Sequence, residues 1–257
     1  MDFNLTQFLA VFLGYAVPLC LWFVLTRRMP GLWTEGDASA LKLPRPWVEL
    51  GWAFVALALI MGFNVLYNTT GLVPRPAAPA LSWLRPWVFP LNLLIIWSPL
   101  FLLLWWRRQG LGSCLLSLRG GGKKLLWGIG GALLGMVVYL LVAARGGDME
   151  LVVSALWRWD GITALQSVIQ FFGFGFLLVR LTAAAGQVAG ILICASLYGL
   201  VKYPYYMNAY SMGFGEATII ILFSIVVGFL AFSMVYARRD VLVLAIIHVF
   251  LDLIQGT

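Results

Sequence analysis

Two residues near the C-terminal end of the sequence could do chemistry together. His248 is the single histidine of the chain, and Asp252 follows it four positions later. If the segment is helical, the two side chains share one helix face. Such a pair could bind a metal ion, pass a proton between its members, or simply satisfy its own polar groups by hydrogen bonding.

Few other polar residues interrupt the long apolar runs of the chain. A charged side chain inside the hydrocarbon of a membrane costs about 2.5–3.5 kcal/mol on insertion scales, so each is a functional candidate. Lys202 is one candidate. Glu49 lies two residues into its run, and we expect it to reach the membrane interface. The neutral polar residues are Gln166, Gln170 and Asn64.

The composition predicts the environment of these residues. Of 257 residues, 62% are apolar and 11% are charged, against about 45–50% and about 25% in soluble domains. This excludes soluble enzymes, disordered chains and disulfide-rich secreted scaffolds, and predicts a polytopic membrane protein formed by a single transmembrane domain, residues 1–257. The net charge of +7 comes from basic residues at the ends of apolar runs, which is typical of membrane topology and not of nucleic-acid binding.

Eight apolar runs are candidates for membrane spans, because a transmembrane helix needs roughly 20 mostly apolar residues. We therefore predict an all-α fold, a bundle of about eight transmembrane helices. The predicted spans are residues 4–26, 47–67, 87–106, 125–144, 161–181, 187–202, 217–237 and 241–255.

The basic residues predict an orientation. The connections after odd-numbered spans hold all but five of the 17 lysines and arginines, and cytoplasmic connections carry the basic excess. Both termini are therefore predicted to be non-cytoplasmic, in a bacterial inner membrane or a related membrane. The five exceptions are Arg75, Arg85, Arg145, Arg158 and Lys202.

Three further patterns concern packing. Gly128/Ala132 and Gly131/Gly135 form small-xxx-small pairs, which allow close helix approach and predict packing inside the bundle. Residues 109–124 are too polar to span and are expected to lie along the cytoplasmic interface. Tryptophans at the predicted span ends are typical of an interfacial aromatic belt: Trp33, Trp47, Trp83, Trp87, Trp105, Trp106 and Trp127.

The segment from about residue 110 to 255 resembles the CPBP family of CAAX prenyl proteases and bacteriocin-processing intramembrane metalloproteases. The likeness rests on the last two runs, a short Arg-Arg-Asp turn and the terminal His248-xxx-Asp252. Members of that family have about eight spans and three motifs: Glu-Glu-xxx-Arg, Phe-xxx-His and a terminal His-xxx-Asn/Asp. In the family, the glutamate and the two histidines organise a metal-activated water.

The resemblance implies a degenerate site here. Ile169 and Gln170 stand at the carboxylate positions, Phe174 at the arginine, Tyr198 at the phenylalanine and Lys202 at the histidine. Hydrolysis by zinc needs about three protein ligands and a nearby base, which a chain with one histidine and these substitutions does not supply. A pseudoprotease is therefore predicted, with a hypothetical Lys202–Asp252 ion pair beside His248 closing the former site.

The leading functional prediction is a non-catalytic accessory, assembly or scaffold subunit that binds another integral membrane protein, with no cofactor or metal expected. One alternative is an active CPBP-type intramembrane metalloendopeptidase that uses zinc with unusual ligands. Another is a pigment- or cofactor-binding membrane subunit in which His248 is the ligand. The sequence leaves the partner, the pathway and the oligomeric state open.

Overall fold

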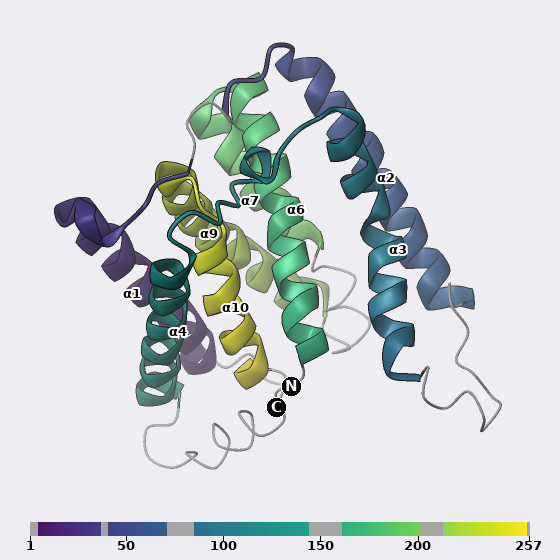
Figure 1. Cartoon of the computed structure of the whole chain (residues 1–257). Helices are drawn as coiled ribbons and strands as arrows, with labels where there is room; N and C mark the ends of the chain where they lie inside the picture. The colour runs from purple at the N-terminus through teal and green to yellow at the C-terminus, as the bar shows by residue number, and fades with distance from the viewer. Residues whose placement is uncertain (1–4, 37–40, 71–84, 144–160, 202–212, 256–257) are drawn as a thin grey trace.

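The chain folds into α-helices. In this computed structural model the described residues are 5–36, 41–70, 85–143, 161–201 and 213–255, and they contain no strand. Every predicted span coincides with a helix. The eight are α1 (Leu5–Arg28), α2 (Pro46–Thr70), α3 (Arg85–Trp106), α4 (Gly121–Ala143), α6 (Gly161–Ala185), α7 (Gln187–Val201), α9 (Phe214–Arg238) and α10 (Leu242–Gln255) (Figure 1).

Five of the helices are long and apolar enough to cross a membrane, namely α1, α2, α4, α6 and α9. This supports the prediction of an integral membrane protein. The sixth and eighth predicted runs form α7 and α10, which have only 15 and 14 residues. α6 and α7 meet at Gly186, whose φ of +85° is a conformation that glycine adopts without steric cost.

The connections that follow odd-numbered spans lie together at one end of the bundle, where distant parts of the chain contact one another. Lys123 Nζ donates to Gly31 O (2.9 Å), and Val241 N donates to Leu115 O (2.8 Å). These connections lie toward the top of the view in Figure 1. We call this the charged end, because it holds Glu35, Glu49, Arg107, Lys124, Arg180, Arg238 and Asp240.

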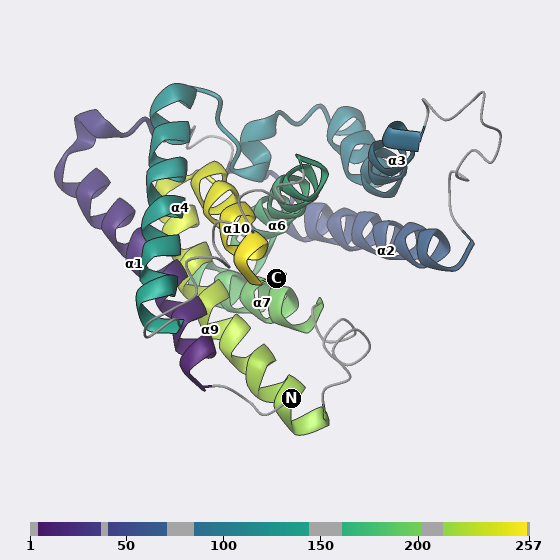
Figure 2. The ribbon, with the colours of Figure 1, turned by 90° about the horizontal axis from the view of Figure 1, so that it is seen from below.

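Helices α2 and α3 form a hairpin that packs on the remaining helices mainly through α6. Figure 2 shows this hairpin as an arm at one side of the molecule, with α6 between it and α10. On the other side of α6, helices α1, α4, α9 and α10 pack together. Outside the hairpin itself, α2 and α3 therefore pack mainly on one helix, α6.

Small residues on α4 let it pack closely against α1 and α10. A Cβ on Gly128 would lie 2.6 Å from the Ile246 side chain, and one on Gly135 would lie 2.5 Å from Gly14 O. Ala132 is fully buried on the same helix. The prediction that these small residues serve packing inside the bundle is thus confirmed.

The segment between α3 and α4 differs from the prediction. Residues Leu111–Cys114 form a short 3-10 helix, η4, in which Ser113 and Cys114 are buried. A Cβ on Gly175 of α6 would lie 2.2 Å from Cys114 O. η4 therefore packs into a notch at Gly175, and α4 begins at Gly121, before the predicted start of the span at residue 125. The expected location of residues 109–124 along the cytoplasmic interface stays a prediction.

The tryptophans divide into two groups. Trp47, Trp105 and Trp106 are exposed at the ends of α2 and α3, as expected of an aromatic belt. Trp33 is instead buried, with its ring edge-on to Trp22 at 5.2 Å, so the belt prediction was wrong for this residue. Trp83 and the side chain of Trp87 lie outside the described residues.

Candidate functional site

His248 lies in the interior of the bundle, where a cluster of aromatic side chains encloses it. Its side chain is 2% exposed. The Nδ1 atom shares a short hydrogen bond with the Tyr15 hydroxyl of α1. The Phe171 ring of α6 packs edge-on against the imidazole, with ring centroids 4.5 Å apart. The hydrogen bond to Tyr15 and the aromatic packing therefore both hold the buried imidazole in place.

The enclosure continues around Tyr198 of α7. Its ring lies 6.4 Å from His248, 5.3 Å from Phe174 and 5.8 Å from Phe232 of α9. We refer to Tyr15, Phe171, Phe174, Tyr198, Phe232 and His248 as the aromatic cluster. Five helices contribute to the aromatic cluster, which therefore connects helices from the beginning, the middle and the end of the chain.

The predicted site residues of α6 are distributed over different faces of the helix. The α6 side chain that packs against the His248 ring is that of Phe171, and not that of Ile169 or Gln170. Ile169 is buried, and Gln170 lines a cavity beside the α2–α3 hairpin. Successive residues of a helix point about 100° apart, which accounts for this separation. Phe174 lines the cavity and also belongs to the aromatic cluster.

Two further predicted residues cannot be placed. Lys202 lies outside the described residues, and Asp252 belongs to α10 but its side chain also lies outside them. The hypothetical Lys202–Asp252 ion pair therefore stays a prediction. Of the predicted residues with described side chains, the fold brings together Phe174, Tyr198 and His248.

The described groups around His248 do not fit a catalytic metal. Within the described part of the chain, no three His, Cys, Asp or Glu side chains gather in a way that could hold an ion. The described ring neighbours of the imidazole, Tyr15, Phe171 and Tyr198, are phenols and a phenyl ring.

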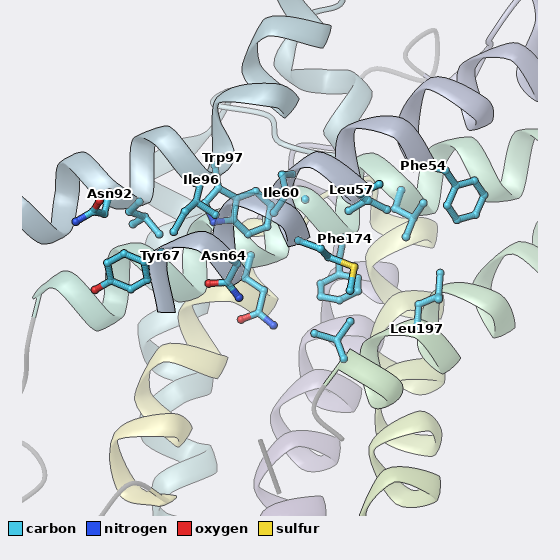
Figure 3. Close-up of a pocket in the computed structure, with 17 residues that line it drawn as sticks. Phe54, Leu57, Ile60, Asn64, Tyr67, Asn92, Ile96, Trp97, Phe174 and Leu197 are labelled. Carbon is cyan, nitrogen blue, oxygen red and sulfur yellow. The ribbon is translucent and has the colours of Figure 1, made fainter. Parts of the chain in front are cut away.

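The cavity lies between the α2–α3 hairpin and the α6–α7 pair, as Figure 3 shows. Its volume is about 490 Å³, within the range of about 300–1,000 Å³ typical of ligand pockets. The wall is mostly apolar, and the three amide residues that line it are Asn64, Asn92 and Gln170. Asn92 Nδ2 donates to Val88 O (2.9 Å). The cavity thus offers an apolar wall with a few hydrogen-bonding groups.

Gly173 and Trp97 set the width of this cavity. A Cβ on Gly173 would lie 2.5 Å from the Trp97 ring. The absent side chain allows the indole of Trp97 on α3 to approach the backbone of α6 closely. A larger residue at this position would push Trp97, and with it the hairpin, away from α6.

The charged end contains a second polar arrangement, centred on Glu49. Both carboxylate oxygens of Glu49 are hydrogen-bonded: Arg107 Nε donates to Oε1 (3.0 Å) and Gln109 Nε2 donates to Oε2 (2.8 Å). Arg180 donates in turn to Gln109 Oε1 and to Ser113 O. Glu49 is 2% exposed, so its carboxylate is buried in the protein, and its expected depth at the membrane interface stays a prediction. Arg107 stabilises the carboxylate inside the protein.

A third polar arrangement joins α4 to the start of α10. Lys124 and Asp240 form an ion pair and are both fully buried. Lys124 Nζ also donates to Ser117 O (2.8 Å), and Asp240 Oδ1 accepts from Leu242 N (2.8 Å), which caps α10. Nearby, burial raises the pKa of the Cys114 thiol to about 12.

Comparison of the chain with models of protein families, with curated proteins and with solved structures finds no match.

Proposed function

We propose that this chain is a non-catalytic integral membrane protein of the CPBP type that binds another membrane protein. The observation that carries the proposal is the pairing of an enclosed His248 with a cavity on a neighbouring face of α6. The imidazole is surrounded by Tyr15, Phe171 and Tyr198, while Gln170 faces the cavity. The polar residue at the former carboxylate position is thus available for binding rather than for hydrolysis.

The cavity suits a helix of a partner protein. Helices in membranes associate through close packing and through hydrogen bonds from side chains such as Asn and Gln. The α2–α3 hairpin packs on the other helices mainly through α6, so the gap between hairpin and α7 can admit a partner's side chains without breaking the packing of α1, α4, α9 and α10. We place both termini outside the cytoplasm in this proposal, on the basis of the basic residues.

Photo-crosslinking in native membranes tests the proposal. A photoreactive amino acid at Leu57 or Leu197, which line the cavity, should give one discrete protein adduct. The same amino acid at Leu126 or Leu222, which are 73% and 58% exposed on other helices, is the matched control and should not give that adduct. The proposal is wrong if the cavity positions give no protein adduct, give only lipid adducts, or give the same adduct as the controls.

A metal analysis separates this proposal from the alternative of a zinc protease. We expect far less than one zinc ion per purified chain, with the same content in the His248→Ala variant. Stoichiometric zinc that disappears in His248→Ala, together with peptide cleavage, would establish the endopeptidase alternative. An absorption band that depends on His248 would instead establish the pigment-binding alternative.

A further inference from the structure

The charged end contains a second cavity, whose lining is basic. Its volume is about 600 Å³, and we call it the basic pocket. Three cationic side chains line it, Lys42, Arg107 and Arg119, together with one carboxylate, Glu49. Gln109, Ser113 and Ser117 add further polar groups to the wall.

The single carboxylate leaves this pocket with an excess of positive charge. Arg107 donates two hydrogen bonds to Glu49 Oε1, and Gln109 donates to Oε2. Among the described residues, no carboxylate forms an ion pair with Lys42 or Arg119. The buried guanidinium of Arg180 lies behind Gln109 and adds another positive charge. An anion in the pocket would therefore meet two exposed cations that Glu49 does not neutralise.

The position of the pocket indicates which anion it meets. Arg107 directly follows α3, and Glu49 lies in the first turn of α2. At the same helix ends Trp47 and Trp105 are 67% and 79% exposed, and exposed tryptophans at span ends lie at the depth of lipid headgroups. Leu111 and Leu118, on the same connection as Arg119, are also exposed. Such apolar side chains are stable when they insert between acyl chains.

We propose that the basic pocket binds the phosphate of an anionic phospholipid headgroup. Lys42 and Arg119 would contact the phosphate oxygens, and Arg107 would contribute its positive charge while remaining bound to Glu49. Basic pockets among the helices of a membrane protein are a recognised way of holding such headgroups. The same phosphate chemistry exists in soluble anions, but the exposed tryptophans and leucines beside the pocket favour a lipid.

The experiment uses the full chain, purified in a neutral detergent, and counts bound lipid by native mass spectrometry. The probes are dioleoylphosphatidylglycerol, dioleoylphosphatidylcholine and inorganic phosphate. We expect the anionic lipid to bind about tenfold or more tightly than the zwitterionic one, since each Lys or Arg near an anionic headgroup contributes about fivefold in affinity. Inorganic phosphate at millimolar concentration should not displace the lipid.

Two double variants with the same change of charge locate the site. Lys42→Gln with Arg119→Gln should lower the affinity for phosphatidylglycerol about tenfold or more. The control is Arg27→Gln with Arg28→Gln, a pair that is exposed at the end of α1 and does not line the pocket; it should change the affinity less than about twofold. All four residues are exposed, so both variants should keep the unfolding transition of the parent protein.

Three results would overturn the proposal. Equal binding of the two lipids would show that the headgroup charge does not matter. Equal loss in the two double variants would show attraction by the net charge alone. Displacement of the lipid by inorganic phosphate at similar concentrations would assign the pocket to a soluble anion. The single variants Lys42→Gln and Arg119→Gln should each show part of the loss, which provides a second measure of the same contacts.

Discussion

Replacement of Gly175 by alanine should loosen the segment that joins α3 to α4. The new Cβ would lie 2.2 Å from Cys114 O and 3.1 Å from Cys114 C. Ordinary contacts begin at 3.4 Å, so η4 must move by more than an ångström. Because the opposing atoms belong to the backbone, no rotamer change relieves the clash.

The expected loss follows from two opposing effects. Alanine in place of a helical glycine stabilises a helix by about 0.5–1 kcal/mol, whereas overpacking of a close contact costs about 1–3 kcal/mol. Movement of η4 also lengthens the hydrogen bond from Arg180 to Ser113 O, now 2.9 Å, and a bond to a charged group is worth about 1.5–3 kcal/mol. We expect the free energy of unfolding to fall by about 1–3 kcal/mol.

The matched controls are Gly62→Ala and Gly130→Ala, which place a Cβ where no atom lies within 4 Å. These variants should be neutral or more stable by up to about 1 kcal/mol. Equilibrium unfolding by sodium dodecyl sulfate in detergent micelles, followed by tryptophan fluorescence, gives the three free energies. A Gly175→Ala variant that is as stable as the two controls would refute the close packing of η4 on α6.

The thiol of Cys114 reports the same movement locally. It is fully buried, and with a pKa of about 12 only about one thiol in ten thousand is ionised near pH 8. In a background where Cys20 and Cys194 are replaced by alanine, maleimide should label Cys114 very slowly in the parent and much faster in Gly175→Ala. Equal labelling rates would contradict the displacement of η4.

Three further predictions concern buried polar groups, each measured by the same unfolding experiment. Tyr15→Phe removes the hydroxyl bonded to His248 Nδ1 and should cost about 1–2 kcal/mol; no loss would mean that the bond does not form in the membrane. Arg107→Gln leaves the Glu49 carboxylate buried without its cation and should cost more than Glu49→Gln, by about 1–2 kcal/mol; the reverse order would contradict the arrangement. Lys124→Met should lower the free energy of unfolding by about 3 kcal/mol, because Asp240 stays charged and buried. Adding Asp240→Asn should recover most of this loss, because the asparagine oxygen still accepts from Leu242 N. Burial raises the pKa of Asp240, and Lys124 opposes the rise. A carboxyl group whose pKa is raised by folding favours the folded state below its unfolded pKa, and this contribution is lost as the pH increases. The loss of unfolding free energy in Lys124→Met should therefore be smaller at about pH 4 than at about pH 8.

The number and order of the helices could be predicted from the sequence. Apolar runs bounded by charge, proline or glycine gave eight spans, and each coincides with a helix. The packing of Gly128 and Gly135 was also predictable, because small residues four positions apart lie on one face of a helix. What such patterns do not predict is which helix the face meets, here α10 for Gly128 and α1 for Gly135.

The burial of charged residues was not predictable in the same way. Glu49 and Lys124 lie at the ends of apolar runs, where charges usually reach water and set the topology. Their partners Arg107 and Asp240 are far away in the sequence, so no local pattern reveals the pairing. Arg180 was the best available signal, because it stands inside the apolar run that forms α6.

The surroundings of His248 were predictable only in part. Its position in the last helix could be predicted from the sequence, whereas the approach of the Tyr198 ring to 6.4 Å comes from the packing of α7. The expected carboxylate positions, Ile169 and Gln170, are two residues and one residue from Phe171, the side chain that meets the imidazole. A shift of one residue turns a helix face by about 100°, and the apolar composition of α6 leaves that rotation undetermined.

The ion pair between Lys124 and Asp240 also has a consequence for how the protein is made. The two residues are 116 positions apart, and ribosomes add about 5–20 residues per second, so the lysine is synthesised on the order of ten seconds before its partner. During that interval the ammonium group must stay in water, which holds the beginning of α4 at the membrane surface. A chain that stops before Asp240 retains Lys124 without its carboxylate partner.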